Sequence, residues 1–438
     1  MSTTGGRRTR AIVLVDGEHH PGVVHDAVEA LSAQHEIAAL VFCGGSEKVG
    51  QATLADAERV YGYDLTFGDD PEAALQSAIA GHRADLVIDL ADEPIVPLSA
   101  KLRLAALAMA AGLAYEAPGM RLDPIEMREL EFAGPKIAVI GTAKRTGKTA
   151  ICGHLAGLIA SAGGAPAIVS MGRGGPPTPQ LAHPHTGLDE LLALARSGVH
   201  AASDYLEDAV LAGVPTVGCR RVGGGPGGQS GPTNFVEGAV LAAGIPGVDF
   251  LLFEGSGATV PPVTADITIC VTASAEQSST LAGPLRLALA DLVLVHADEP
   301  GALDAARRWT RGEVVPFSLI PGPAGDIPAE ARVAFFSTGL GEPEGVEAVV
   351  TSRNLARRAE LEADLNRAAA AGCTHYLTEL KAAAIDLVAE RAQREGAEVV
   401  FVRNRPVTSD ADLDEILLTM HERANNLVVA RAGGGGDA

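Results

Sequence analysis

Short runs of aliphatic and β-branched residues alternate along the chain with longer Ala- and Leu-rich stretches whose apolar residues recur at helical spacing. In the first part of the chain, strands are predicted at 11–15, 37–42 and 85–90, and a long helix is predicted at about 98–111. A repeated strand–helix order is typical of βα units and a parallel sheet. The fold class is therefore α/β, beginning with a Rossmann-like unit.

The apolar pattern stops near Phe132, and Gly134 with Pro135 provides a break before a second series of strands. This series has seven strand-like runs: KIAVI, AIVSM, TVGCRRV, DFLLFEG, DITICV, DLVLVHA and VAFFSTG. Such a series suits a doubly wound, mostly parallel sheet. After about Gly341 the pattern predicts one more strand at 346–350, two helical segments, a strand at 398–402 and a terminal helix.

The length of 438 residues suits about three domains. We expect an N-terminal Rossmann-like α/β domain over 1–133, a central nucleotide-binding catalytic domain over 134–340, and a small C-terminal α/β segment over 341–438. The glycine-rich tail AGGGGDA at the end of that segment is expected to be disordered.

The charge balance limits the partners. The chain has 34 basic and 55 acidic residues, a formal net charge of −21. A field of that sign opposes unspecific attraction to nucleic acid or to an anionic membrane, and we expect neither partner. A phosphorylated ligand must instead be bound where basic residues are concentrated locally.

Cysteine content and hydropathy indicate the compartment. The five cysteines are widely spaced and form no C-x-x-C pair, which argues against a disulfide framework or a zinc site. No uninterrupted apolar stretch reaches the roughly 20 residues needed to cross a bilayer. We expect a cytoplasmic protein.

The strongest chemical signal lies in 136–160, KIAVIGTAKRTGKTAICGHLAGLIA. A buried-type strand ends at Gly141, and Gly147 opens a helix, which is the setting of a phosphate-binding loop. Backbone N–H groups of such a loop surround a polyphosphate, Lys148 reaches its β and γ phosphates, and the Thr149 hydroxyl ligates Mg²⁺. ATP and Mg²⁺ are therefore the expected cofactors, held by Gly141, Thr142, Thr146, Gly147, Lys148 and Thr149.

This loop departs from the strict G-x-x-x-x-G-K-S/T pattern, because Thr142 stands where the leading glycine is required. The frame GT-x-x-x-x-GKT resembles the variant in the dethiobiotin synthetase-like branch of P-loop proteins. A chance G-K-T in a glycine-rich chain is the alternative, but it would not explain the strand and helix on either side.

A P-loop enzyme needs an acidic residue at the end of a neighbouring strand to hold or orient the metal. Glu254 directly follows four apolar residues in FLLFEGSGA, and it is the metal candidate together with Thr149. A capping or solvated strand-end glutamate is the alternative.

Two glycine-rich loops place arginines at predicted strand exits, Arg173 in one and Arg220 with Arg221 in the other. Lys144 and Arg145 belong to the P-loop itself. Guanidinium suits bidentate phosphate binding, so these cations predict a second, phosphorylated substrate beside ATP. Catalytic roles are expected for Lys148, Lys144, Arg145 and Arg173, and substrate binding for Arg173, Arg220 and Arg221. Surface ion pairs are the alternative for each arginine.

The early turn VDGEHHP carries Asp16, Glu18, His19 and His20 at a predicted strand exit, with His25 soon after. These residue types could bind a metal, but their spacing matches no metal motif. We expect Asp16, Glu18 and His19 to take part in recognising a phosphorylated substrate or in closing over the active site.

Four further positions are less informative. His183 and His185 are expected to be loop residues with a possible substrate role. Near the C-terminus, Glu379 and Lys381 could close over a nucleotide, but solvated helix positions are the favoured interpretation.

At GTAKRTGKTA, MGRGGP and VDGEHHP, and again at THYLTELKAAAIDL over 374–387, the chain resembles the cyclic 2,3-diphosphoglycerate synthetase family. The resemblance implies an ATP-dependent ligase whose substrate is 2,3-diphosphoglycerate. It implies closure of an intramolecular phosphoanhydride, with release of ADP and phosphate. We expect a homo-oligomer, most simply a dimer, although no sequence pattern specifies the oligomeric state.

Two other functions stay open at this point. A dethiobiotin synthetase-like ligase acting on another anionic substrate would need fewer cations near the loop. A P-loop regulatory switch of the partitioning type usually carries a lysine directly before two glycines, whereas Lys144 is followed by Arg145 and Thr146.

Overall fold

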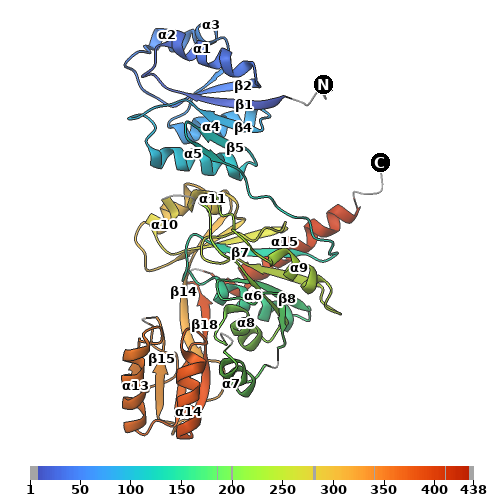
Figure 1. Cartoon of the computed structure of the whole chain (residues 1–438), viewed down its shortest axis with the longest axis vertical. Coiled ribbons are helices and arrows are strands. Elements are labelled where there is room, and N and C mark those ends of the chain that lie inside the picture. Colours follow the sequence, from blue (N-terminus) through green and yellow to red (C-terminus); the bar gives the residue numbers. More distant parts are fainter. Residues whose placement is uncertain are drawn as a thin grey trace.

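The computed structural model describes residues 8–184, 186–198, 201–279, 283–339, 341–409 and 411–433. Its strands form one six-stranded and one twelve-stranded sheet. Figure 1 shows the N-terminal sheet at one end of an elongated molecule, the P-loop region in the middle and the C-terminal strands at the other end. The α/β fold class predicted from the sequence is confirmed.

The N-terminal sheet has the strand order β3-β2-β1-β4-β5-β6, parallel except for the β5–β6 pair. Its strands are β1 (Thr9–Val15), β2 (His35–Phe42), β3 (Leu65–Thr66), β4 (Leu86–Asp89), β5 (Ala114–Ala117) and β6 (Met120–Leu122). Its helices are α1 (Pro21–Ser32), α2 (Gln51–Ala55), α3 (Ala57–Tyr61), α4 (Pro71–Gly81) and α5 (Leu98–Ala110). The order reverses between β1 and β4, which is where ligands bind in open α/β sheets.

The large sheet has the order β16-β15-β17-β18-β14-β13-β12-β7-β11-β8-β10-β9. Its P-loop half contains β7 (Lys136–Gly141), β8 (Pro166–Gly172), β9 (Gln180–Ala182), β10 (Thr216–Arg220), β11 (Phe250–Glu254), β12 (Ile267–Thr272) and β13 (Leu292–His296). The remaining strands are β14 (Glu313–Pro323), β15 (Val333–Phe336), β16 (Ala348–Ser352), β17 (His375–Thr378) and β18 (Glu398–Val407). The strand that leads into the P-loop, β7, pairs in parallel with β11 and β12, near the middle of the sheet.

Helices cover this sheet. Around the P-loop half they are α6 (Lys148–Ser161), α7 (Leu188–Arg196), α8 (Asp204–Ala212), α9 (Phe235–Ala243), α10 (Ala275–Ser279), α11 (Gly283–Ala288) and α12 (Ala302–Arg307). Further along the chain come α13 (Arg358–Ala370), the π-helix η1 (Ala384–Ala389), α14 (Glu390–Glu395) and α15 (Leu413–Gly433). None of the helices in the described part of the chain is long and apolar enough to cross a membrane.

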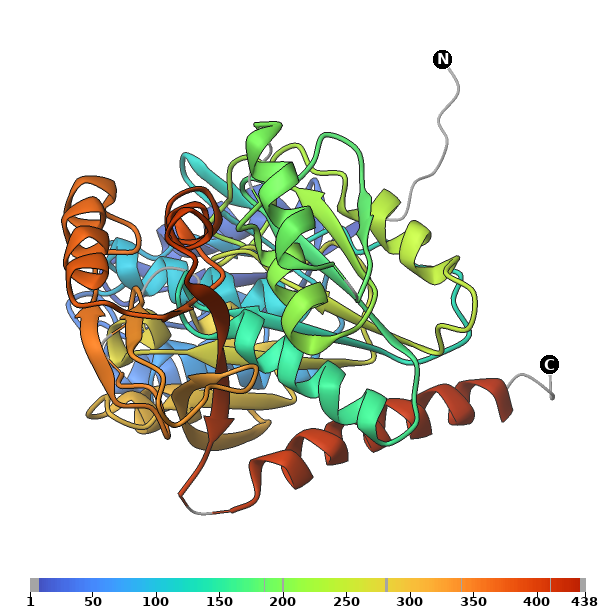
Figure 2. The same ribbon diagram turned by 90° about the horizontal axis from the view of Figure 1, so that it is seen from below.

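The P-loop helix α6 buries one face against the sheet. Ile151, Leu155 and Ile159 are at most 1% exposed, as their helical spacing predicts, and Leu158 is only partly buried. The last helix, α15, returns from the C-terminal strands and packs beside α6, as Figure 2 shows. Burial of these apolar side chains holds the P-loop helix on its sheet.

The strands of the C-terminal segment continue the large sheet. The run VAFFSTG, expected beside the P-loop strands, forms β15 between β16 and β17. The strand expected at 346–350 lies at Ala348–Ser352. Of the expected tail, Ala432 and Gly433 end α15, and 434–438 lie outside the described residues.

Strand β14 joins the two halves of the sheet. It pairs in parallel with β13 from Glu313 to Phe317 and antiparallel with β18 from Ser318 to Pro323. Strand β14 was not predicted from the sequence, because its three prolines interrupt the apolar run. As a result, the carboxyl ends of the P-loop strands and those of β15 and β17 open on the same cavity.

Candidate functional site

The P-loop is a tight turn between β7 and α6. Gly147 caps the helix with a positive φ of 97°, and Arg145 also adopts a left-handed conformation, with φ 62°. A Cβ on Gly141 would lie 2.7 Å from the Thr146 hydroxyl. Both glycines are therefore required by the backbone path, and the N-terminus of α6 points into the loop, as anion binding requires.

Lys148 lies inside this loop. Its Nζ donates to the carbonyl oxygen of Ala143 at 2.8 Å, and it lies 3.4 Å from the Thr146 hydroxyl. Burial lowers the pKa of Lys148 to about 8. The ammonium thus stands among the loop groups that would surround a polyphosphate.

Glu254 ends β11 beside the P-loop helix and is 2% exposed. Its Oε1 accepts from the Thr149 hydroxyl and its Oε2 from the Ser170 hydroxyl, both at 2.5 Å. Burial raises the pKa of Glu254 to about 7, and the charge of Asp204 adds to the shift. No sequence pattern had indicated a role for Ser170.

The donors around Glu254 fit Mg²⁺ as a P-loop would bind it. Thr149 and Glu254 bring hydroxyl and carboxylate oxygens, the ligands this ion prefers, into direct contact. Among the described residues there is no group of three or more His, Cys, Asp or Glu side chains that could hold a metal ion. The remaining ligands would be phosphate oxygens and water, as is usual for Mg²⁺ in nucleotide sites.

Neighbouring strand ends hold the loop in place. The Thr142 hydroxyl donates to the side-chain oxygen of Gln277 at 3.1 Å and lies 2.9 Å from the Thr272 hydroxyl. His296, at the end of β13, has its Nε2 3.0 Å from the Thr146 carbonyl oxygen. The side chain of Thr142 therefore anchors the loop.

Only some of the predicted cationic residues line the same cavity. Lys144, Arg145, Lys148 and Arg173 line one cavity of about 730 Å³. Arg220 is exposed, and its backbone N–H donates to Asn234, while its side chain does not line the cavity.

Arg221 lies next to Arg173 behind the cavity wall. It is 6% exposed and its guanidinium donates to the Ser256 carbonyl oxygen at 2.8 Å. A Cβ on Gly257 would lie 2.6 Å from Arg173 Nη2 and 3.3 Å from Arg221 Nη2, so both guanidinium groups pack against this glycine. Burial lowers the pKa of Arg221, and the charge of Arg173 lowers it further.

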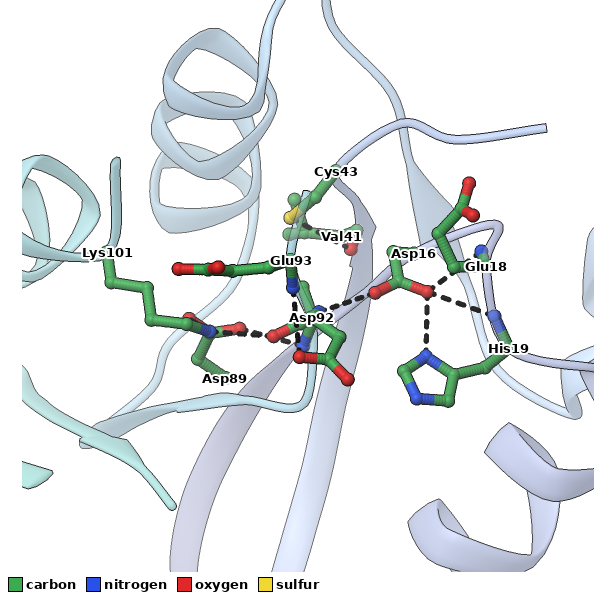
Figure 3. Close-up of polar contacts among 10 residues, drawn as sticks. Asp16, Glu18, His19, Val41, Cys43, Asp89, Asp92, Glu93 and Lys101 are labelled. Carbon is green, nitrogen blue, oxygen red and sulfur yellow. Dashed lines mark hydrogen bonds and ion pairs between the residues drawn. The ribbon is translucent and has the colours of Figure 1, made fainter. Parts of the chain in front are cut away.

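The N-terminal turn does not reach this cavity. Asp16 is fully buried, and its Oδ1 accepts from the backbone N–H groups of Glu18 and His19 and lies 2.8 Å from His19 Nδ1. Its Oδ2 accepts from the Asp92 N–H at 2.6 Å. Figure 3 shows these contacts converging on Asp16. No described residue of the N-terminal sheet lines the cavity, so the substrate role expected for Asp16, Glu18 and His19 stays a prediction.

The other histidines have local partners or lie elsewhere. His20 caps α1 by accepting from the Gly22 N–H, and His25 Nδ1 lies 3.1 Å from the Tyr61 carbonyl oxygen. His183 is exposed and does not line the cavity, and His185 lies outside the described residues.

The interpretation of Glu379 and Lys381 as solvated helix positions was wrong. Glu379 follows β17 directly and Lys381 comes two residues later, and both line the cavity opposite the P-loop. Glu379 is buried and accepts from the Thr338 backbone N–H at 2.7 Å and from its hydroxyl at 2.8 Å. The two residues were assigned to a helix because β17 has only four residues and the residues after it have a helical composition.

A buried lysine in a glycine-rich loop and an oxygen pair suited to Mg²⁺ define the class of protein as a P-loop nucleotide-binding enzyme. Several cations surround the cavity beside this loop. Family models divide the chain among three domains of one family, cyclic 2,3-diphosphoglycerate synthetase. Its N-terminal domain matches residues 10–123, its P-loop domain 136–306 and its C-terminal domain 328–405.

Curated relatives agree with these models. The cyclic 2,3-diphosphoglycerate synthetase of Rubrobacter xylanophilus is 41% identical over 434 residues, covering 92% of this chain and 95% of the relative. The protein of that name from Methanothermobacter thermautotrophicus is 34% identical and covers 94% and 96%. This chain belongs to the cyclic 2,3-diphosphoglycerate synthetase family, and it is an ATP-dependent enzyme.

Proposed function

We propose that the enzyme converts 2,3-diphosphoglycerate into cyclic 2,3-diphosphoglycerate, with ATP becoming ADP and phosphate. The relatives carry the name of this product, and the cavity suits two polyanions. The observation that carries the proposal is the gathering of Lys144, Arg145, Lys148 and Arg173 around one cavity in a chain of net charge −21.

The chemistry needs activation because joining two phosphates in water is unfavourable. In the route we propose, an oxygen of one substrate phosphate attacks the γ-phosphorus of ATP and ADP leaves. An oxygen of the other substrate phosphate then attacks the activated phosphorus, and the terminal phosphate leaves. One P–O–P bond remains within the ring of the product.

The side chains act by binding and orienting. Lys148 and the N–H groups at the start of α6 would hold the β and γ phosphates, and Arg173 would hold the substrate with Arg221 behind it. Thr149 and Glu254 would hold Mg²⁺, which neutralises phosphate charge when bound. The attacking phosphate oxygens are already deprotonated at neutral pH, so no side-chain base is required.

The test is a phosphorus NMR experiment on the purified protein with ATP, Mg²⁺ and 2,3-diphosphoglycerate. We expect substrate-dependent ADP formation and new resonances in the diphosphate region from the cyclic product. Slow ATP hydrolysis that ignores the substrate would favour the regulatory switch. ADP formation that depends on a different anion would favour another ligase.

Three properties complete the proposal. We propose a cytoplasmic enzyme, because all five cysteines are free and buried, as in a reducing compartment. The net charge of −21 supports the absence of a nucleic-acid partner. The dimeric state stays a prediction, which light scattering of the purified protein tests.

A further inference from the structure

The wall of the cavity that faces the P-loop comes from the C-terminal strands. Parallel strands β15 and β17 end there, and the residues that follow them line the cavity, namely Ser337, Thr338, Gly339, Glu379 and Lys381. The carboxyl end of a parallel sheet is where α/β proteins bind ligands. The cavity therefore lies between two such edges, and only one of them is the P-loop edge.

The loop after β17 is rigidly held. Glu379 joins it to the end of β15 through its two hydrogen bonds with Thr338. Leu380 is fully buried, and its neighbours in the core include residues of α7 and α8. The backbone around Lys381 is thus fixed to both halves of the sheet.

The local backbone is unusual immediately after Lys381. Ala382 adopts a left-handed conformation with φ 49°, which costs energy for a residue with a Cβ. The π-helix η1 begins at Ala384, and π-helical turns are rare and frequent at functional sites. Both features lie directly after the cavity-lining residue Lys381.

The ion-pair partner of Lys381 comes from the other half of the sheet, and the charges of Glu379 and Asp204 also act on Lys381. Its Nζ lies 3.4 Å from Oε1 of Glu207 on α8, and its side chain is 35% exposed. Glu207 is 6% exposed, and its charge raises the pKa of Lys381. An ammonium has three donors, so this single long contact leaves capacity for a ligand in the cavity.

The cavity also needs a cation at this position. The described cations that line it are Lys144, Arg145, Lys148, Arg173 and Lys381, and the first four come from the P-loop half. The opposite wall carries the carboxylate of Glu379, and Asp204 lines the cavity as well. Without Lys381, a phosphate near that wall would meet uncompensated negative charge.

We propose that Lys381 is a substrate-binding residue that contacts a phosphate of the diphosphoglycerate from the wall opposite the P-loop, and that Glu207 is its positioning residue. This inference rests on the function proposed above. It makes the C-terminal strands part of the substrate site, so that the two substrate phosphates are held from two sides while the ring closes.

The experiment measures binding directly, by calorimetric titration of 2,3-diphosphoglycerate into protein loaded with Mg²⁺ and a non-hydrolysable ATP analogue. We expect Lys381→Met to weaken substrate binding about tenfold or more, and Lys381→Arg to recover part of it. The affinity for the ATP analogue should change less than about twofold. Unchanged substrate binding by Lys381→Met, or an equal loss for substrate and nucleotide, would overturn the assignment.

Two further variants separate binding from folding. Lys101 forms a similar half-buried pair with Asp89 in the N-terminal sheet, at 2.8 Å, so Lys101→Met controls for the loss of an ion pair as such. If Lys381→Met fails to fold, the double variant Glu207→Gln/Lys381→Met avoids leaving a buried charge alone. It should show the same selective loss of substrate binding, and wild-type affinity for the substrate would again overturn the assignment.

Different results would contradict the proposed function and the proposed role of Lys381. If the wild-type protein itself binds no diphosphoglycerate, the proposed function fails and the role of Lys381 falls with it. If the wild type binds the substrate and Lys381→Met binds it equally well, only the role of Lys381 fails.

Discussion

Two sheet edges can be compared, the carboxyl ends of β1 and β4 in the N-terminal sheet and those of β7 and β11 in the large sheet. They share a buried carboxylate but differ in what surrounds it. Each places a buried carboxylate at a strand exit, Asp16 in the first and Glu254 in the second. Both carboxylate oxygens of Asp16 accept hydrogen bonds from backbone N–H groups, which belong to its own turn and to the loop after β4. Glu254 instead borders a cavity lined with cations.

The buried carboxylates at the two edges also differ in how fully they are hydrogen-bonded. Asp89, beside Asp16, accepts from Lys101 at 2.8 Å and from the Tyr115 hydroxyl. Near Glu254, by contrast, one carboxylate oxygen each of Glu207 and Asp208 is buried without a hydrogen-bond partner. Donors of the surrounding residues therefore engage Asp16 and Asp89, although the Tyr61 hydroxyl near Asp16 also lacks a partner, whereas the carboxylates near Glu254 keep free acceptor oxygens.

The largest expected effect is at the P-loop. Lys148→Ala should lower ATP turnover about 10²–10³-fold, because it removes the buried cation nearest the transferred phosphate. ADP release in a coupled assay measures it. Lys101→Ala, at the other edge, should lower the melting temperature and leave the rate per folded molecule within about twofold. Equal losses of rate would contradict the comparison.

The next effect concerns the arginines. Arg173→Ala should raise the KM for diphosphoglycerate about 10–100-fold and change the KM for ATP far less, because it removes a charged phosphate contact. Steady-state kinetics in both substrates measures the split. Arg220→Ala is the matched control, since this exposed side chain does not line the cavity, and it should stay within about twofold of wild type.

Replacement of Asp16 tests whether the carboxylate at the N-terminal edge has a structural role. Asp16→Ala should lower the free energy of unfolding by about 2–4 kcal/mol, because three backbone N–H groups lose their acceptor. Urea unfolding measures this loss. A structural role predicts an unchanged KM for diphosphoglycerate in the folded variant. A raised KM would instead support the substrate role expected from the sequence.

The smallest effect is a pH dependence. Burial raises the pKa of Glu254 to about 7, above its unfolded value, so the folded protein holds an extra proton between about pH 4.5 and 7. Stability from this group is therefore full below about pH 4.5 and is lost as the pH rises to 7.

Melting temperatures of the ligand-free protein between pH 5 and 7.5 test this sign. They should fall less steeply with pH in Glu254→Gln than in wild type. Glu207 carries a similar shift, so part of the slope should persist in the variant. Identical slopes in the two proteins would show that Glu254 does not titrate in this range.

The sequence predicted local structure well and tertiary proximity poorly. The β7–α6 unit and Glu254 were predictable because their signals lie within short segments, a strand, a glycine loop and the end of a second apolar strand. Lys381 could not be placed, because its environment depends on Glu207 from a distant segment. Arg220 and Arg221 are adjacent in sequence, yet only Arg221 turns inward, because successive side chains at a strand end point to opposite sides.

The continuity of β14 has a mechanical consequence. One strand carries the pairing of both halves of the large sheet, and its residues Ser318, Leu319 and Pro321 form part of the cavity lining between them. A shared strand resists rotation of one half against the other, so the distance between the two walls is set during folding. The charges that would offset the repulsion between the two proposed polyanions are therefore already in position before any ligand binds.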